Sequence, residues 1–251
     1  MDWTFTATPL PYGLVHWLIL GGILAAAAIF AFAIRKADEQ RLLRLLFVFG
    51  LCMLAAETWK QWFVIRCIYC GTRSMWFFPW QLCSMAMYCS ALVPFLRGKA
   101  QEAMLVFLCT FSMIGAVFAL LFPEDMMRPQ ILLFCHSFLY HAVMLLEGLI
   151  AFRILRRRKA VSFYPALLLY LGMAVVAEIV NTVSHFLVDG ISNEANMFYI
   201  TPFYPSTQPV FDAIAAHAGI AVEIAVYLGA IALGAFLLFL LEFRLRKKNK
   251  A

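Results

Sequence analysis

Residues 14–36 read Leu14-Val-His-Trp-Leu-Ile-Leu-Gly-Gly-Ile-Leu-Ala-Ala-Ala-Ala-Ile-Phe-Ala-Phe-Ala-Ile34-Arg35-Lys36. Apart from His16, every residue from Leu14 to Ile34 is apolar or glycine. A helix needs about 20 such residues to cross a hydrocarbon core of about 30 Å, because it rises about 1.5 Å per residue. The stretch therefore predicts a transmembrane helix that ends at a basic pair.

The rest of the chain repeats this pattern. Of its 251 residues, 64% are hydrophobic and only 14% are charged, whereas soluble domains carry about 25% charged residues. Six more apolar stretches cover residues 42–65, 76–96, 103–122, 130–152, 161–188 and 218–243. We expect an all-α polytopic membrane protein, a seven-transmembrane-helix bundle that forms one domain over residues 1–251. The net charge of +6 does not indicate nucleic acid, because the basic residues cluster at the ends of the predicted spans.

The distribution of Lys and Arg predicts the orientation, since cytoplasmic loops are rich in both. One set of alternate loops holds Arg35, Lys36, Arg41, Arg44, Arg97, Lys99, Arg153, Arg156, Arg157, Arg158, Lys159, Arg244, Arg246, Lys247, Lys248 and Lys250. The other set holds only Arg66, Arg73 and Arg128. We therefore expect the N-terminus outside and the C-terminus in the cytoplasm, in a multi-pass protein of the cell membrane.

Two further features concern the shape of the predicted bundle. Pro79, Pro94 and Pro165 are expected to bend their helices or to lie in first turns. The long outer loop at 189–217 is rich in proline and aromatic residues and poor in charge. Such a loop is expected to fold against the membrane-embedded part rather than extend into water.

Polar side chains are unevenly distributed along the predicted spans. Ionisable groups in a bilayer cost at least about 2.5 kcal/mol at its centre, so they normally face the interior of a bundle. Those in the outer half are Glu57, Lys60, Gln81, Cys83, His136, His141, Glu178, Asn181, His185 and Glu223. Their shared depth predicts a polar pocket that opens outward. The structural alternative is that Glu57 and Lys60 neutralise each other and that Asn and His tie helices together.

Metal and redox chemistry have weaker support. His136 and His141 lie about 140° apart around a helix, which is not the i, i+4 arrangement of zinc proteases, so no metal and no cofactor are predicted. The last span has no lysine for a retinal Schiff base. The sequence Cys67-Ile-Tyr-Cys70 is a C-x-x-C pair near the outer surface, where disulfide exchange with a partner is chemically feasible.

Several short strings together resemble the YwaF family of bacterial integral membrane proteins, whose eukaryotic relatives include a transmembrane phospholipid acyltransferase. Phe78-Pro-Trp-Gln-Leu-Cys83-Ser is similar to a family Leu-Pro-Leu-His-Leu-Cys-Ser, Ala119-Leu-Leu-Phe-Pro123 to Ala-Leu-Leu-x-Pro, and His136-x-x-x-x-His141 matches a histidine pair. Two positions depart from the family. Gln81 replaces a histidine, and Trp80 stands where the eukaryotic relatives have their proposed catalytic cysteine.

Three functions are compatible with these residues. The first is a protein that binds a lipid or amphiphile, including acyl transfer on phospholipid, with His136 or His141 as base and Cys83 as nucleophile. The second is a proton- or ion-coupled transporter of small solutes that uses Glu57, Lys60, Glu178 and His185. The third is a thiol oxidoreductase that uses Cys67 and Cys70. The expected partners are membrane lipids and a lipid or small-molecule substrate, without nucleic acid; the sequence does not predict the oligomeric state.

Overall fold

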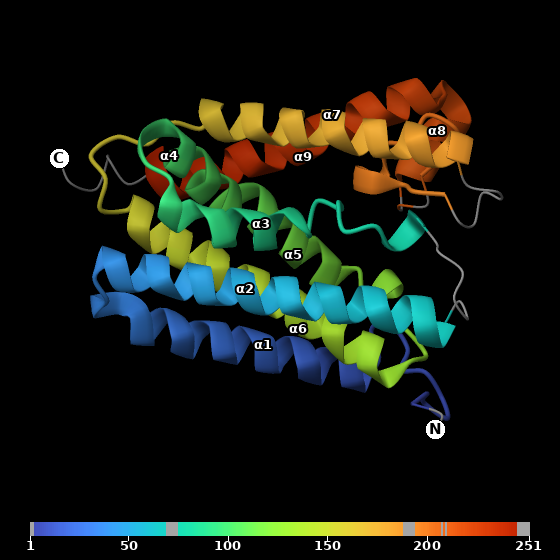
Figure 1. Ribbon diagram of the computed structural model, residues 1–251, viewed down its shortest axis with the longest axis horizontal. Coiled ribbons are helices and arrows are strands. Elements are labelled where there is room, and N and C mark those ends of the chain that lie inside the picture. Colours follow the sequence, from blue (N-terminus) through green and yellow to red (C-terminus); the bar gives the residue numbers. More distant parts are fainter. Residues whose placement is uncertain (1–2, 69–74, 188–193, 207, 209, 245–251) are drawn as a thin grey trace.

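The computed structural model describes residues 3–68, 75–187, 194–206, 208 and 210–244 (Figure 1). Within these residues, six helical stretches are long and apolar enough to span a membrane. They are built from α1 (Leu14–Ala33), α2 (Glu39–Phe63), α4 (Gly98–Phe107) with α5 (Met113–Leu121), α6 (Ile131–Leu155), α7 (Tyr164–Leu187) and α9 (Ile220–Phe239). The helical class and six of the predicted spans are thus confirmed.

Local sequence signals explain where several of these helices begin and end. Asp38 caps α2, because its carboxylate accepts the backbone N–H of Arg41 at 2.8 Å, and this hydrogen bond lowers the pKa of Asp38. Pro165 lies in the first turn of α7, where its missing N–H has no helical partner. A short helix, α8 (Phe211–Ala218), is separated from α9 by Gly219, whose φ of 90° ends one helix before the next begins.

The third predicted span is not one continuous helix. A 3₁₀ turn at Met75–Phe77 leads into an irregular stretch at residues 78–84, and only α3 (Met85–Leu92) and the 3₁₀ turn Val93–Phe95 follow. Pro79 has no N–H to donate and disfavours the helical conformation of the residue before it. The prediction of seven complete helices was therefore wrong at this position. We call residues 75–84, the 3₁₀ turn and the irregular stretch, the broken segment. The broken segment and α3 run antiparallel to α2 along the bundle (Figure 1).

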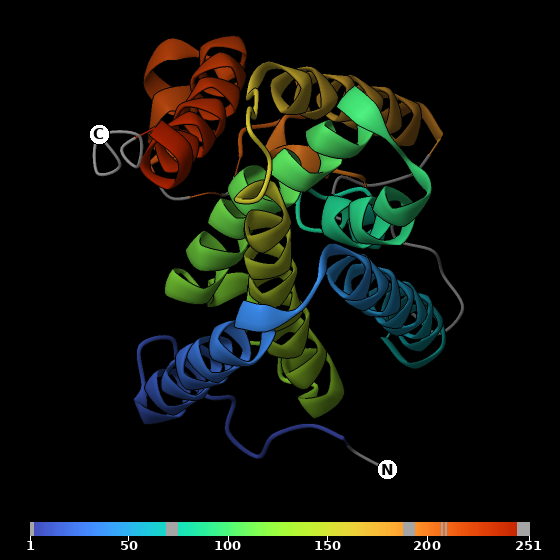
Figure 2. The same ribbon diagram turned by 90° about the vertical axis from the view of Figure 1, so that its left-hand side faces the viewer.

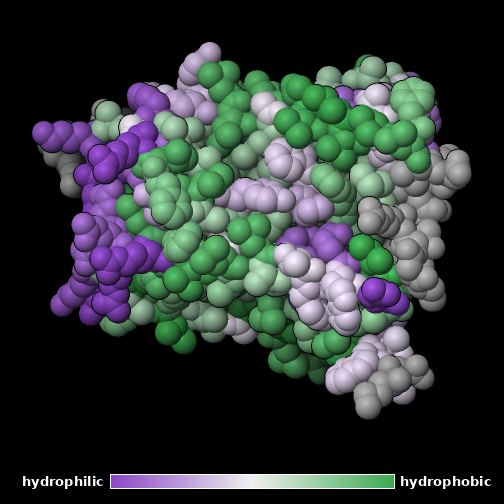
Figure 3. All heavy atoms as spheres, in the orientation of Figure 1, coloured by the Kyte–Doolittle hydropathy of each residue, from purple (hydrophilic) through white to green (hydrophobic). Residues whose placement is uncertain are grey.

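The helices radiate around α6 (Figure 2). This helix packs against α1, α2, α4 and α5, and the view along the bundle shows it between the other arms. α1 and α9 lie at the periphery, and most of their apolar side chains stay exposed within the chain. On the face seen in Figure 3, hydrophobic residues cover much of the middle around a paler, partly hydrophilic patch, and hydrophilic residues gather at one end. We call this the basic end; it includes the α1–α2, α3–α4 and α6–α7 connections.

Two glycines allow helices to approach closely. A Cβ atom added to Gly50 of α2 would lie 2.4 Å from the backbone nitrogen of Ala91 in α3. A Cβ added to Gly148 of α6 would lie 3.2 Å from the carbonyl oxygen of Leu108, in the π-helical turn Leu108–Ser112 that joins α4 to α5. Small residues at helix contacts are the usual means by which membrane helices gain van der Waals packing. Gly50 therefore determines how closely α3 packs against α2.

We predict that Gly50→Ala destabilises the protein by about 1 to 3 kcal/mol, because the new methyl group meets backbone atoms that cannot rotate away. The free energy of unfolding in detergent, measured by denaturant titration, tests this. Gly229→Ala in α9 is the matched control, since nothing lies within 4 Å of its Cβ position, and it should stabilise the helix slightly. Equal effects of the two substitutions would contradict the close contact.

Candidate functional site

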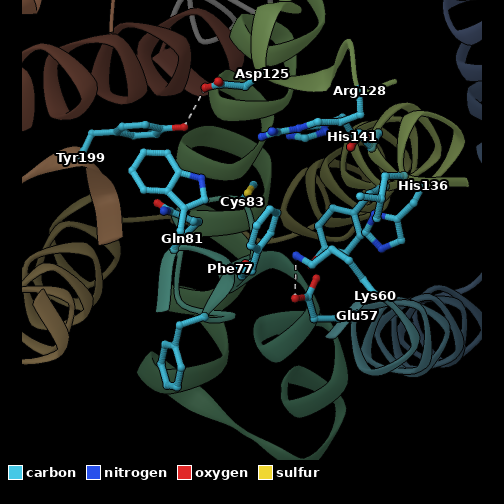
Figure 4. Close-up of a pocket in the computed structure, with 16 residues that line it drawn as sticks. Glu57, Lys60, Phe77, Gln81, Cys83, Asp125, Arg128, His136, His141 and Tyr199 are labelled. Carbon is cyan, nitrogen blue, oxygen red and sulfur yellow. Dashed lines mark hydrogen bonds and ion pairs between the residues drawn. The ribbon is translucent and has the colours of Figure 1, made fainter. Parts of the chain in front are cut away.

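A cavity of about 140 Å³ lies in the half of the bundle away from the basic end. Its walls come from α2, the broken segment, α6, the α5–α6 connection and the loop after α7 (Figure 4). The sixteen lining residues are Glu57, Lys60, Trp76, Phe77, Phe78, Gln81, Cys83, Ser84, Asp125, Arg128, Leu133, His136, Ser137, Tyr140, His141 and Tyr199. Six of the residues expected from sequence therefore meet in one place: Glu57, Lys60, Gln81, Cys83, His136 and His141.

Glu57 and Lys60 form an ion pair across one turn of α2. Lys60 Nζ lies 2.7 Å from Glu57 Oε1. The amide of Gln61 also donates to Glu57 Oε1 at 2.7 Å and donates to the carbonyl of Phe77. The carboxylate of Glu57 is thus satisfied within the protein, and Gln61 connects α2 to the start of the broken segment. The structural role considered for this pair is present, although both residues also line the cavity.

The hydrogen bond of His141 determines which of its nitrogens is a base. His141 Nδ1 lies 2.8 Å from the carbonyl oxygen of Ser137. A carbonyl oxygen only accepts hydrogen bonds, so neutral His141 carries its proton on Nδ1 and leaves the lone pair on Nε2. His141 therefore offers Nε2 as an acceptor at the cavity, which is the arrangement that a general base requires.

His136 and Tyr140 form a stacked pair one turn apart on α6. Their ring centroids lie 5.5 Å apart, and Trp59 of α2 packs near His136 at 6.1 Å. The hydroxyl of Tyr140 and Nε2 of His136 are both buried without a hydrogen-bond partner among the described residues. Buried polar atoms without partners are costly, so this wall of the cavity is suited to a polar group of a ligand.

Cys83 lies at the centre of the labelled side chains in Figure 4. It comes from the irregular stretch just before α3, where Ser84 N donates to the carbonyl of Gln81 at 2.8 Å. Non-helical backbone at membrane depth is tolerated where it is buried in protein or lines a cavity. The break at Pro79 therefore brings the thiol to the cavity. Trp80, by contrast, is not among the lining residues and donates its indole N–H to the carbonyl of Met173 in α7.

Several polar lining residues were not anticipated from sequence as site residues: Ser84, Asp125, Arg128, Ser137, Tyr140 and Tyr199. Asp125 Oδ2 accepts the hydroxyl of Tyr199 at 3.1 Å and the amide of Gln208 at 3.4 Å. Arg128 is one of only three arginines in the loops predicted to lie outside. Basic residues are uncommon in such loops, so its presence there was the signal in the sequence that could have indicated a functional role.

Gln81 and Asn181 bind the backbone of the segment after α7. Asn181 Nδ2 donates to the carbonyl of Met197 at 3.2 Å, and Met197 N donates to Asn181 Oδ1 at 2.6 Å. Gln81 Nε2 donates to the carbonyl of Asn196 at 2.9 Å, and Phe198 N donates to Gln81 Oε1 at 2.9 Å. We call these four hydrogen bonds the amide clamp. It satisfies backbone groups that have no water to bind.

The clamped segment is among the most buried parts of the chain. Met197, Phe198 and Asn196 are at most 1% exposed, and Phe198 and Tyr199 adopt positive φ values of 58° and 56°. Ala195 N also donates to the hydroxyl of Ser184 in α7 at 2.8 Å. The described part of the long loop thus folds against the helices, as the sequence predicted.

The remaining predicted residues do not line the cavity. His185 Nδ1 lies 3.0 Å from Glu194 Oε2, and its ring stacks on Phe203 with centroids 3.7 Å apart. Glu178 is half-buried and accepts the hydroxyl of Thr182 at 3.4 Å. Glu223 is buried in the first turn of α9. The polar layer inferred from depth is therefore divided between the cavity and the surroundings of the loop.

The redox and metal hypotheses gain no support from the structure. Cys67 is exposed in the π-helical turn Val64–Ile68, whereas Cys70 lies outside the described residues. In the parts of the chain that the structure describes, no three His, Cys, Asp or Glu residues are grouped closely enough to hold a metal ion.

Comparison with known proteins identifies the family. The TMEM164 family matches residues 11–243. The chain belongs to this family. No curated protein and no solved structure matches it. In this TMEM164 family protein the matched residues include every described wall of the cavity and both residues of the amide clamp.

We predict that Asn181→Leu in this TMEM164 family protein lowers the free energy of unfolding by about 1 to 3 kcal/mol. Both hydrogen bonds to Met197 are lost, and its backbone groups remain buried without partners. Hydrogen exchange followed by mass spectrometry should show faster exchange in the segment that contains Met197 and Phe198.

Thr182→Val serves as the control for Asn181→Leu. Thr182 is the next residue of α7 and contacts Glu178 rather than the loop. Its substitution should leave exchange at Met197 unchanged. Unaltered exchange in Asn181→Leu itself would mean that the amide clamp does not hold the segment.

Proposed function

We propose that this TMEM164 family protein transfers an acyl chain between phospholipids at the cavity, with Cys83 as nucleophile and His141 as general base. The observation that carries the proposal is the convergence of a thiol, a histidine with its Nε2 lone pair available and a buried unpartnered hydroxyl on one cavity in an apolar bundle. A nucleophile, a base and a hydrogen-bond donor are the components that acyl transfer needs.

The size of the cavity indicates which part of a lipid would enter. At about 140 Å³ it is smaller than the roughly 300 to 1,000 Å³ of sites that enclose whole drug-sized ligands. It accommodates an ester group and its nearest atoms, while the acyl chains stay against the apolar surface of the helices. Lys60, whose side chain is 20% exposed, would lie beside the entering head group.

The first half of the reaction forms an acyl-enzyme. The Sγ–H proton of Cys83 passes to His141 Nε2, and the sulfur attacks the carbonyl carbon of a lipid ester. The tetrahedral intermediate collapses as the carbon–oxygen ester bond breaks, and His141 returns the proton to the departing oxygen. The products are a lysolipid and a thioester on Cys83.

The second half reverses these steps with a different acceptor. The hydroxyl of a second lysolipid gives its proton to His141 and attacks the thioester, which restores the Cys83 thiol and yields a new diacyl lipid. Tyr140 would donate a hydrogen bond from its hydroxyl to the oxyanion in both halves, and such donors commonly contribute about 10²- to 10³-fold in rate. His136 stacks on Tyr140 and acts as a positioning residue for this hydroxyl.

The choice of Cys83 is consistent with the departures from the resembled family. Trp80 is committed to a hydrogen bond with Met173, and Gln81 is committed to the amide clamp. These two positions therefore carry neither the thiol nor the imidazole of the resembled family, whereas Cys83 has a thiol and lines the cavity.

Acyl transfer is preferred to transport on the placement of the charged residues. Glu57 and Lys60 line the cavity, but Glu178 and His185 do not. A proton or ion relay through Glu57, Lys60, Glu178 and His185 would need all four side chains in one place. In the described structure only the first two line the cavity.

We predict that purified protein in nanodiscs of phosphatidylethanolamine converts an isotopically labelled lysophospholipid into labelled diacyl lipid. Cys83→Ala should abolish the conversion, and His141→Gln should slow it by about 10²- to 10⁴-fold because a general base is lost. Lipid mass spectrometry gives the rate, and intact-protein mass spectrometry should detect the thioester on Cys83.

Cys135→Ser is the matched thiol control for this experiment. Cys135 is exposed on α6, beside His136 in sequence, and does not line the cavity. Its variant should keep the wild-type rate. Full conversion by Cys83→Ala would exclude the proposed nucleophile, and no conversion by any form would exclude acyl transfer.

A further inference from the structure

The charges around the cavity do not all find partners within the protein. Lys60 pairs with Glu57 at 2.7 Å, and Asp125 accepts hydrogen bonds from Tyr199 and Gln208. Both carboxylates that line the cavity are therefore engaged. Arg128, the remaining cation in the lining, forms no ion pair with any residue the structure describes.

Arg128 instead lies over an aromatic ring. Its guanidinium carbon is 5.8 Å from the centroid of Phe77, a contact that orients the cation without neutralising its charge. Phe77 also lines the cavity. The guanidinium therefore keeps hydrogen-bond donors available for a planar anion, and its fork suits phosphate better than an ammonium group does.

The backbone that carries Arg128 is held from several sides. Phe5 N donates to the carbonyl of Pro129 at 3.0 Å, and Ile131 N donates to the carbonyl of Trp3 at 2.9 Å. The same connection is tied to α1 by Tyr12, whose hydroxyl donates to Glu124 at 3.1 Å. A cation on a fixed support loses little conformational entropy when it binds an anion.

The position of Arg128 matches the depth of lipid phosphates. It lies between the end of α5 at Leu121 and the start of α6 at Ile131, so it sits where two spanning helices leave the hydrocarbon core. His136 lies five residues after Ile131, so it is about 7.5 Å further along α6 than the start of the helix, at a rise of about 1.5 Å per residue. In a phospholipid the ester groups likewise lie a few bonds below the phosphate, toward the chains.

We propose that Arg128 is the specificity-determining residue that binds the phosphate of the lipid substrate and thereby places its ester beside Cys83. This rests on the proposed function for the ester chemistry, but the phosphate contact itself does not need catalysis. It makes the site selective for lipids with a phosphate at head-group depth over neutral diacylglycerol, which has the same esters and no anion.

Binding can be measured separately from turnover. Full-length protein with Cys83→Ala, reconstituted in nanodiscs, would be titrated with fluorescent phosphatidylethanolamine and with fluorescent diacylglycerol of the same chains. We expect the phospholipid to bind about ten- to a hundredfold more tightly, the value of a charge-assisted bidentate contact. This variant has no nucleophile at position 83, so the result does not depend on acyl transfer.

Arg128→Gln should reduce the affinity for phosphatidylethanolamine to nearly that for diacylglycerol, and Arg128→Lys should recover part of the difference. Arg66→Gln is the matched control. Arg66 is an exposed arginine at the end opposite the basic end, and it does not line the cavity. Arg66→Gln should leave the preference for phosphatidylethanolamine over diacylglycerol unchanged. Undiminished discrimination in Arg128→Gln would overturn the proposal.

Inorganic phosphate distinguishes a lipid phosphate from a free anion. Weak competition by millimolar phosphate is expected, because the lipid also contributes the apolar contacts of its chains. If inorganic phosphate displaced the lipid with equal affinity, the site would be a binding site for free phosphate and the lipid assignment would be wrong. Loss of acyl transfer with retained discrimination would reject the proposed reaction alone.

Discussion

The amide clamp is the interaction on which the arrangement of the cavity depends. In hydrocarbon, every backbone N–H and C=O must be satisfied by the protein. The chain interrupts its helix at Pro79 and folds residues 194–201 into the interior, so two irregular segments need partners at once. Gln81 and Asn181 supply them through side-chain amides that imitate backbone groups. This fixes the two segments that carry Cys83 and Tyr199.

The charges around the cavity follow from the same constraint. A buried carboxylate is tolerated when it is paired or hydrogen-bonded, and Glu57 is held by Lys60 and Gln61. Asp125 is held by Tyr199 at the mouth. With these groups satisfied internally, the polar groups that remain for a ligand at the cavity are the hydroxyl of Tyr140, which has no partner among the described residues, and the guanidinium of Arg128, which forms no ion pair there.

Much of the fold and part of the site could be predicted from the sequence. Apolar length predicted seven spans, and six of them are long helices in the described structure because membrane thickness allows few alternatives. Depth brought Glu57, Lys60, Cys83, His136 and His141 to one level. The same reasoning grouped Glu178, His185 and Glu223 with them, because depth does not specify the direction in which a side chain points around its helix. Asp125 and Arg128 were missed as site residues because loop residues carry no depth signal.

The sequence by itself determined the membrane class, the positions of six long helices and the collection of basic residues at one end. These depend on the transfer free energy of individual side chains between water and hydrocarbon, which each stretch of chain experiences alone. Only the tertiary structure decided that the third segment breaks, that Gln81 and Asn181 bind backbone, and that Cys83 and His141 line the same cavity. Those outcomes depend on tertiary hydrogen bonds, of which those of Gln81 join residues more than a hundred positions apart, and on the close approach of α2 to α3, which no local pattern encodes.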